Sequence, residues 1–101
     1  NPLPVMNGIS WNDEYHLIYI DSPVGVGYSV AGNDLPTNSM QNAFHINNFI
    51  VRFFELYPSL KKQDFYILGD SYAGHYIPVI AVVMLQNYSN NGVNLKGKSF
   101  V

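Results

Sequence analysis

The 101-residue chain contains no cysteine and few charged residues, which make up 12% of the sequence. Without cysteine it can form no disulfide, no thiolate nucleophile and no cysteine-ligated metal site. There is no run of Lys or Arg and the formal net charge is −2, which argues against nucleic acid as a partner. No apolar stretch reaches the roughly 18 residues that a membrane-spanning helix requires, so we expect no membrane span.

Hydrophobic residues are abundant by contrast, at 48% of the chain. A high apolar content with so little charge suits part of a larger core better than a free-standing small domain. The chain opens on Asn1 and not on methionine, and no signal peptide opens it. We therefore expect residues 1–101 to be an incomplete, central part of one domain in a longer protein.

The hydrophobic pattern predicts strands and helices in alternation. Short, almost continuously apolar runs predict buried strands, whereas apolar residues at i, i+3 and i+4 predict a helix that starts at Asn38 or Ser39 and runs to about Tyr57. A second helix is expected from Tyr76 to Tyr88. The expected strands are residues 16–21, 64–68 and, as the beginning of a third strand, 99–101. This order implies right-handed crossovers and a parallel sheet, so the predicted fold class is α/β.

A glycine-containing loop, residues 22–29, follows the first predicted strand. Gly25 and Gly27 resemble the start of a dinucleotide-binding fingerprint, but the third glycine is missing and Pro23 interrupts the tight turn. We therefore expect no nucleotide cofactor here. Open α/β sheets build their sites in loops at the carboxyl ends of parallel strands. The loop is accordingly interpreted as an active-site wall whose glycines allow close approach of the backbone.

The segment Leu68–His75 lies between the second predicted strand and the second predicted helix. Ser71 stands near its centre, with small residues on both sides of it. A serine between a strand end and a helix start is the pattern of the nucleophile elbow in α/β-hydrolases, where a strained backbone lifts the hydroxyl above the sheet edge. The backbone N–H of Tyr72 would then face an oxyanion that forms on a substrate carbonyl. The alternative is a plain strand-to-helix turn in which Ser71 is the helix N-cap.

Several blocks of the sequence resemble the serine carboxypeptidase family. The nucleophile motif of that family usually reads Gly-Glu-Ser-Tyr-Ala-Gly, followed by an aromatic residue and proline, and residues 69–78 are similar to it. The resemblance extends, in the same order as in the family, to residues 10–12, 21–29, 43–58 and 94–97. These blocks together cover nearly the whole chain.

The resemblance implies an α/β-hydrolase, with a mostly parallel sheet and flanking helices, that removes C-terminal residues from peptides. It implies that Ser71 is the nucleophile and that the N–H of Tyr72 is one oxyanion donor. No cofactor and no metal ion are expected. A histidine and an aspartate would complete the catalytic triad, and in hydrolases of this fold both follow the serine in the chain.

The expected triad partners do not lie within these residues. No Asp or Glu follows Ser71, His75 is too close to it on the same helix, and His16 and His45 precede it. The family's upstream Trp-Asn-Gly-Gly-Pro-Gly segment, which supplies a second oxyanion donor, is also absent. We therefore expect that residues 1–101 alone do not form a competent enzyme.

Asp70 departs from the family's motif, in which glutamate helps to bind the C-terminal carboxylate of the substrate through a hydrogen bond between carboxyl groups. Such a pair must share a proton, which favours acidic working conditions. Aspartate keeps the acid on an arm that is shorter by one methylene group. Plant acyltransferases that resemble this family often carry aspartate here and transfer an acyl group from a glucose ester. Residues 73–76, in contrast, look more like those of the peptidases.

The sequence leaves three functions open: a serine-type carboxypeptidase that acts on peptide substrates, an acyltransferase of similar sequence, and a non-catalytic relative that serves as a binding module. A serine exposed in a strained turn favours an enzyme. The resemblance implies a secreted, lysosomal or vacuolar protein. Asn87-Tyr88-Ser89 is an N-glycosylation sequon, which has meaning only in a secreted chain. The pattern carries no signal of oligomeric state.

Overall fold

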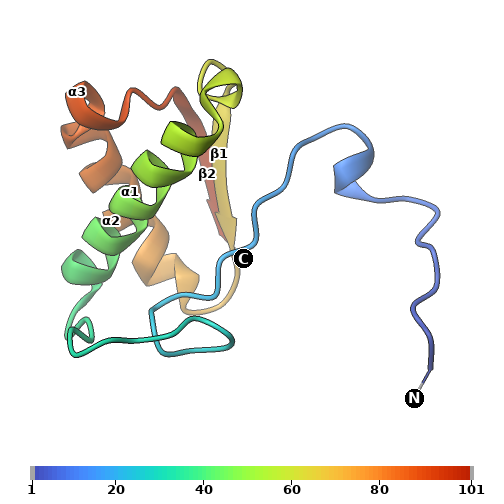
Figure 1. Ribbon diagram of the computed structural model, residues 1–101, viewed down its shortest axis with the longest axis horizontal. Helices are drawn as coiled ribbons and strands as arrows, with labels where there is room; N and C mark the ends of the chain where they lie inside the picture. The colour runs from blue at the N-terminus through green and yellow to red at the C-terminus, as the bar shows by residue number, and fades with distance from the viewer. Residues whose placement is uncertain (1, 101) are drawn as a thin grey trace.

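The computed structural model describes the backbone of residues 2–100 and the side chains of residues 2–97. Two long helices and two strands form its body, and the N-terminal residues trail away from them (Figure 1). The elements in chain order are a 3-10 helix η1 (Trp11–Asp13), α1 (Ser39–Leu56), a 3-10 helix η2 (Pro58–Leu60), β1 (Phe65–Gly69), α2 (Ala73–Gln86), α3 (Tyr88–Asn91) and β2 (Leu95–Phe100). No helix in the described part of the chain is long and apolar enough to cross a membrane.

The sheet consists of β1 and β2, which pair in parallel with Phe65 opposite Leu95 and Gly69 opposite Phe100. Parallel strands need a long crossover connection, and here α2 and α3 provide it. The prediction of an α/β arrangement with a parallel sheet is confirmed at the level of these two strands and their helices.

β2 begins earlier than the strand predicted for residues 99–101. The Phe65 N–H already donates to the Asn94 carbonyl at 2.9 Å, so the ladder between the strands starts there and continues through Gly97. Pairing with β1 therefore overrides the low strand propensity of glycine and lysine in this segment. Val101, the last residue predicted as strand, lies outside the described residues.

The helix predicted from Asn38 or Ser39 to about Tyr57 is confirmed as α1. Asn38 is its N-cap, because the side-chain oxygen accepts from the backbone N–H of Gln41 at 2.9 Å. Pro58 lacks the N–H that would continue the helix, and it begins η2 instead.

The second helix begins at Ala73 and not at the predicted Tyr76. The prediction was wrong because the turn after β1 is itself helical in its hydrogen bonding, with the Ala73 N–H donating to the Asp70 carbonyl at 3.0 Å. Pro78 consequently lies inside α2. The predicted end at Tyr88 falls in the short α3, which continues directly from α2.

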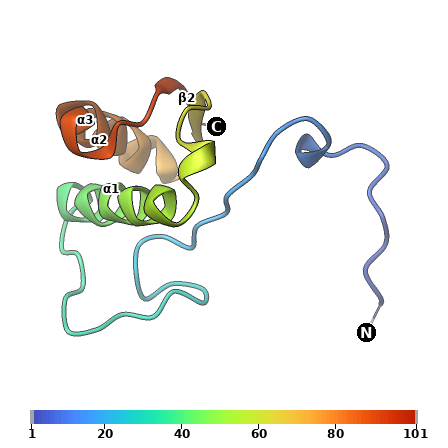
Figure 2. The same ribbon diagram turned by 45° about the horizontal axis from the view of Figure 1, so that its top comes forward.

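α2 lies on one face of the sheet and α1 packs across α2 (Figure 2). The ring of Phe54 in α1 reaches the sheet, with its centroid 6.0 Å from that of Phe65. The opposite face of β1 is uncovered within the described chain, where Tyr66 and Leu68 are 55% and 59% exposed. The core between the helices and the sheet is formed by Ala43, Ile50, Phe54, Ile80, Val83, Met84 and Val93.

The strand predicted for residues 16–21 is not formed. The segment is irregular, and it runs past the sheet without lying beside either strand (Figures 1 and 2). A strand is stabilised by ladder hydrogen bonds to a neighbour, and within the described residues β1 pairs with β2 alone. The apolar run is therefore only partly covered: Leu17, Ile18 and Ile20 are 37–38% exposed, and Tyr19 is 84% exposed.

Candidate active site

The turn between β1 and α2 consists of Asp70, Ser71 and Tyr72. Ser71 has a φ of 55° and is the only non-glycine residue in the described chain with a positive φ. This left-handed conformation costs a residue that carries a Cβ on the order of 1–2 kcal/mol. Ser71 is also exposed, at the carboxyl end of β1. These are the features expected of a nucleophile elbow.

Ser71 does not cap α2. The N-cap position belongs to Tyr72, and no side-chain hydrogen bond caps this end of the helix. The alternative prediction, a plain turn with Ser71 as the N-cap, is therefore wrong. Backbone carbonyls satisfy the first helical N–H groups instead; the His75 N–H, for example, donates to the Tyr72 carbonyl at 2.9 Å. The Ser71 hydroxyl is thus not used to stabilise the helix.

Gly69, the last residue of β1, allows the strand and the helix to approach closely. A Cβ placed on it would lie 2.6 Å from the Ala73 Cβ and 2.8 Å from the Ile77 Cδ1. Packed carbon atoms prefer separations of about 3.5–4.0 Å. A larger side chain at Gly69 or Ala73 would push α2 away from β1 and would open the turn that holds Ser71.

The backbone N–H of Tyr72 donates no hydrogen bond within the residues that the structure describes. It lies at the N-terminus of α2, where the helix dipole places partial positive charge. The Tyr72 ring is 60% exposed, and its centroid lies 4.8 Å from the His75 ring and 5.0 Å from the Tyr76 ring. The site therefore offers an unused backbone donor and an aromatic wall next to Ser71.

Asp70 is exposed on the other side of Ser71. The ion pair found in the described part of the chain joins Arg52 and Glu55 and leaves Asp70 unpaired. His75 directs its ring against Tyr72 and forms no hydrogen bond with Ser71. Among the residues described, no group of three or more His, Cys, Asp or Glu side chains is arranged to hold a metal ion.

The loop of residues 22–29 is closed by hydrogen bonds to Asp21. The Asp21 carboxylate accepts from the Tyr28 N–H at 2.8 Å, and the Asp21 carbonyl accepts from the Ser29 hydroxyl at 2.6 Å. Gly27 has a φ of 55°, and a Cβ on it would collide with the Asp21 carboxylate. The backbone of Gly27 thus makes the close approach that is predicted for the loop glycines. The group that it approaches is the Asp21 carboxylate, which holds the loop closed.

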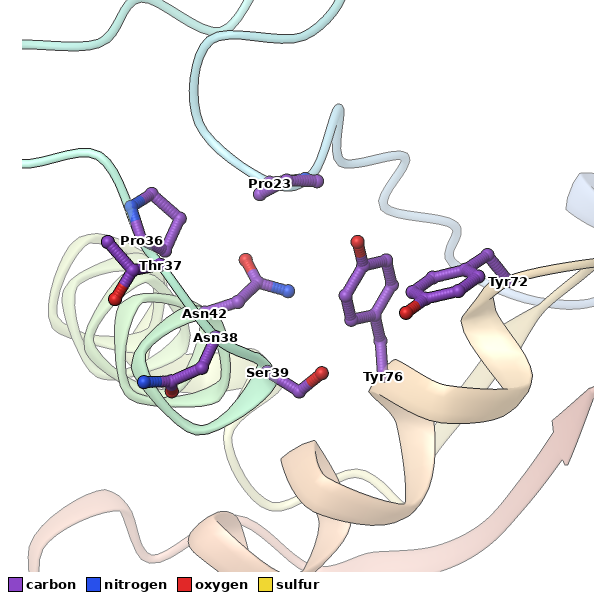
Figure 3. Close-up of a pocket in the computed structure, with 8 residues that line it drawn as sticks. All are labelled: Pro23, Pro36, Thr37, Asn38, Ser39, Asn42, Tyr72 and Tyr76. Atoms are coloured by element: carbon purple, nitrogen blue, oxygen red, sulfur yellow. The ribbon is translucent and has the colours of Figure 1, made fainter.

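This loop contributes Pro23 to a pocket between the N-terminal ends of α1 and α2 (Figure 3). The cavity volume is about 190 Å³. Ser39 and Asn42 of α1 line one side, and Tyr72 and Tyr76 line the other. Every residue that lines the pocket is uncharged.

Asn42 is the buried polar group of this pocket. It is 2% exposed, and its Oδ1 accepts from the Ser22 hydroxyl at 3.0 Å. Its Nδ2 is buried and has no hydrogen-bond partner among the described residues. Figure 3 shows this nitrogen facing Tyr76 across the pocket. A buried hydrogen-bond donor that the described protein does not use therefore lies in the wall of the pocket.

Nothing in the sequence marks Asn42 as a functional residue. It lies mainly off the apolar stripe of the helix, which predicts an exposed side chain, but it is 2% exposed, bonded to Ser22 of the loop and across the pocket from Tyr76. One signal was available: Asn42 precedes Ile46 by one helical turn and so lies at the edge of the buried stripe.

Comparison with known proteins agrees with these features. The family model described as serine carboxypeptidase matches residues 1–100. "Serine carboxypeptidase-like 50" of Arabidopsis thaliana is 42% identical over 90 residues, covering 87% of this chain and 20% of the relative. "Carboxypeptidase Y homolog A" of Podospora anserina is 44% identical over 92 residues, covering 91% of this chain and 16% of the relative.

The chain therefore spans about a fifth of the length of the curated relatives that it matches. The match includes the strand, the turn at Ser71 and the helix that follows it. On the extent of the family match and the identity to these relatives, this chain belongs to the serine carboxypeptidase family.

Proposed function

We propose that the protein of which this chain is a part is a serine-type carboxypeptidase, which releases C-terminal residues from peptides through an acyl-enzyme on Ser71. The observation that carries the proposal is the exposed serine at a φ of 55° between a strand and a helix. A turn that only connected these elements would favour glycine at such a φ. Serine in spite of the strain is accounted for by the chemistry of its hydroxyl.

In the proposed reaction the Ser71 Oγ attacks the carbonyl carbon of the last peptide bond, and its proton passes to a histidine from another part of the protein. The carbonyl oxygen becomes an oxyanion, which accepts a hydrogen bond from the Tyr72 N–H. Collapse of this intermediate breaks the C–N bond, and the amine of the C-terminal residue leaves with the proton held by the histidine. Water then hydrolyses the ester and frees Ser71.

Asp70 is proposed to bind the C-terminal carboxylate of the peptide. It is exposed, precedes Ser71 directly and forms no ion pair within the described part of the chain. A hydrogen bond between two carboxyl groups requires one shared proton, so we expect activity to be highest under acidic conditions.

The proposal includes an α/β-hydrolase fold, of which residues 1–101 are an incomplete central part. The triad histidine and aspartate and the second oxyanion donor would come from the rest of the protein, and no cofactor is required. We expect a secreted, lysosomal or vacuolar location, with Asn87 as a candidate glycosylation acceptor. The Asn87 Nδ2 donates to the Val83 carbonyl at 2.7 Å. A glycan on this nitrogen would replace one of its two hydrogens, so the remaining hydrogen would have to make this bond.

The proposal is tested on the full-length protein. The wild type should release the C-terminal amino acid from a blocked dipeptide at acidic pH and should react covalently with a fluorophosphonate probe. Ser71→Ala should abolish the labelling and lower kcat by several orders of magnitude. Ser59→Ala, which changes an exposed serine in η2, should leave both unchanged. Covalent labelling of the Ser71→Ala variant by the probe would contradict the proposal.

The acyltransferase remains the second candidate because Asp70 stands where the peptidases usually carry glutamate. Incubation of the full-length protein with a glucose ester and an acyl acceptor separates the two. Acyl transfer without peptide cleavage favours the acyltransferase, whereas release of a free amino acid favours the peptidase. A protein that neither reacts with the probe nor turns over either substrate is the non-catalytic binding relative.

A further inference from the structure

We propose that the pocket between α1 and α2 is a specificity subsite, in which Asn42 Nδ2 donates a hydrogen bond to an uncharged, hydrogen-bond-accepting side chain of the peptide, such as the amide of Gln or Asn. This inference rests on the proposed function. Tyr72 lines the pocket and is bonded directly to Ser71. Adjacent Cα atoms are about 3.8 Å apart, so a side chain beside the scissile bond is within reach of the pocket.

The unused donor is the first argument. Asn42 is 2% exposed and its Nδ2 has no partner among the described residues, although its Oδ1 is held by the Ser22 hydroxyl. A buried donor without an acceptor is unfavourable. A substrate carbonyl or hydroxyl oxygen placed opposite this nitrogen would satisfy it, and the bond to Ser22 keeps the amide oriented for that role.

The size of the pocket is the second argument. A cavity needs a volume of about 10–15 Å³ to hold one water molecule, whereas the volume of this cavity is about 190 Å³. The pocket therefore has room for a side chain and not merely for one bridging water. The rings of Tyr72 and Tyr76, which meet edge to face, and Pro23 supply apolar walls for the methylene groups of that side chain (Figure 3).

The absence of charge in the lining is the third argument. No charged side chain among the described residues lines the pocket, so a Lys, Arg, Glu or Asp side chain would lose its hydration without gaining a counter-charge from them. An apolar side chain would fill the space but would leave the Asn42 donor unpaired. A neutral acceptor is the chemistry that avoids both costs, which leads us to expect selectivity for Gln over Met and over Glu.

The test compares kcat/KM of the full-length protein on blocked dipeptides that carry Gln, Met or Glu, in one series at the terminal position and in another at the penultimate position. In the series that uses the pocket, the wild type should prefer Gln over Met by about tenfold, the effect of one hydrogen bond. Asn42→Ala should remove this preference, so that kcat/KM on Gln falls to about the value on Met. Asn48→Ala, an exposed asparagine of the same helix, should behave as wild type.

Tyr76→Phe is the second variant, because it removes one hydroxyl from the pocket while keeping the ring that packs against Tyr72. It should lower the ratio of kcat/KM on Gln to kcat/KM on Met by about threefold with no loss of thermal stability, and it tests the subsite even if Asn42→Ala does not fold.

A wild type that cleaves peptides without preferring Gln in either series overturns the subsite alone. Equal loss on all substrates in Asn42→Ala overturns it as well. A wild type that cleaves no peptide, or whose cleavage survives Ser71→Ala, overturns the proposed function instead.

Discussion

At the residue scale, Ser71 combines a strained backbone with an accessible hydroxyl. Its φ of 55° is a conformation that persists only where the surroundings impose it. The surroundings here are β1, which ends at Gly69, and α2, which begins at Ala73. The strain is therefore maintained by the packing of strand against helix, and it can be separated experimentally from the chemistry of the hydroxyl.

We expect Ser71→Gly to be more stable than Ser71→Ala. Glycine adopts a positive φ without a steric penalty, whereas alanine keeps the Cβ clash, so the free energies of unfolding should differ by about 1 kcal/mol. Chemical denaturation of the two full-length variants measures the difference. Both lack the hydroxyl, and both should therefore be inactive in peptide hydrolysis. Equal stability of the two variants would contradict the strain argument.

Gly69→Ala should lower the free energy of unfolding by about 1–3 kcal/mol, because the new methyl group would overlap Ala73 and Ile77. It should also slow the reaction of Ser71 with a fluorophosphonate probe, since α2 must move. Gly32→Ala is the matched control, because nothing lies within 4 Å of a Cβ at that position. The control should change stability by less than about 0.5 kcal/mol. Similar effects at both glycines would show that close packing at Gly69 is unimportant.

At the scale of elements, a buried asparagine joins both helices to the entry of β2. Asn91 is 1% exposed, and its Nδ2 donates to the Asn47 Oδ1 at 2.9 Å and to the Met84 carbonyl at 2.8 Å. Its Oδ1 accepts from the Val93 N–H at 2.9 Å. Since every polar atom of this side chain is paired in the interior, it fixes the direction in which the chain leaves α3.

Asn91→Ala should therefore destabilise the full-length protein by about 3 kcal/mol, because it leaves buried groups of Asn47 and Val93 unpaired, each at a cost of about 1–3 kcal/mol. Asn90→Ala, the exposed neighbour, should change the free energy of unfolding by less than about 0.5 kcal/mol. Urea denaturation of both variants measures the difference. A small effect at Asn91 would mean that water replaces the lost bonds.

The elements also differ in how well the sequence predicts them. α1 is predicted closely because its signals are local: an apolar stripe, the Asn38 cap and Pro58 at the end. The start of α2 is not predicted correctly. Hydrogen bonds such as that from the Ala73 N–H to the Asp70 carbonyl extend the helix back into the turn at Ser71, and they depend on how α2 packs against β1. The strand at residues 16–21 fails because a strand exists only with a partner, and apolar content does not supply one.

At the scale of the whole molecule, apolar surface stays accessible on the uncovered face of β1, at Tyr66 and Leu68, and along the N-terminal segment. Exposed apolar patches of this kind mark surfaces that other chain segments cover. The chain spans about a fifth of the length of its curated relatives, which agrees with this interpretation. The large exposed side chains of the N-terminal segment include Leu3, Val5, Met6, Ile9, Trp11 and Tyr15.

We expect residues 1–101 produced alone to bind a hydrophobic dye such as anilinonaphthalene sulfonate and to aggregate, whereas the full-length protein should bind much less of the dye. The apolar faces that the rest of the protein would cover are free in the isolated chain. Fluorescence titration and size-exclusion chromatography compare the two. A monomeric, dye-free chain of 101 residues would show that this part is a self-sufficient domain.

The family, the position of the nucleophile candidate and the limits of α1 can be derived from the amino-acid sequence, because motif residues, caps and helical spacing are local properties of the chain. The φ of Ser71, the burial of Asn42 and the failure of residues 16–21 to form a strand cannot, and they become visible in the folded chain. Each of these depends on which segments meet in space. Backbone strain, buried polar groups and strand pairing are all set by neighbours that are distant in the sequence.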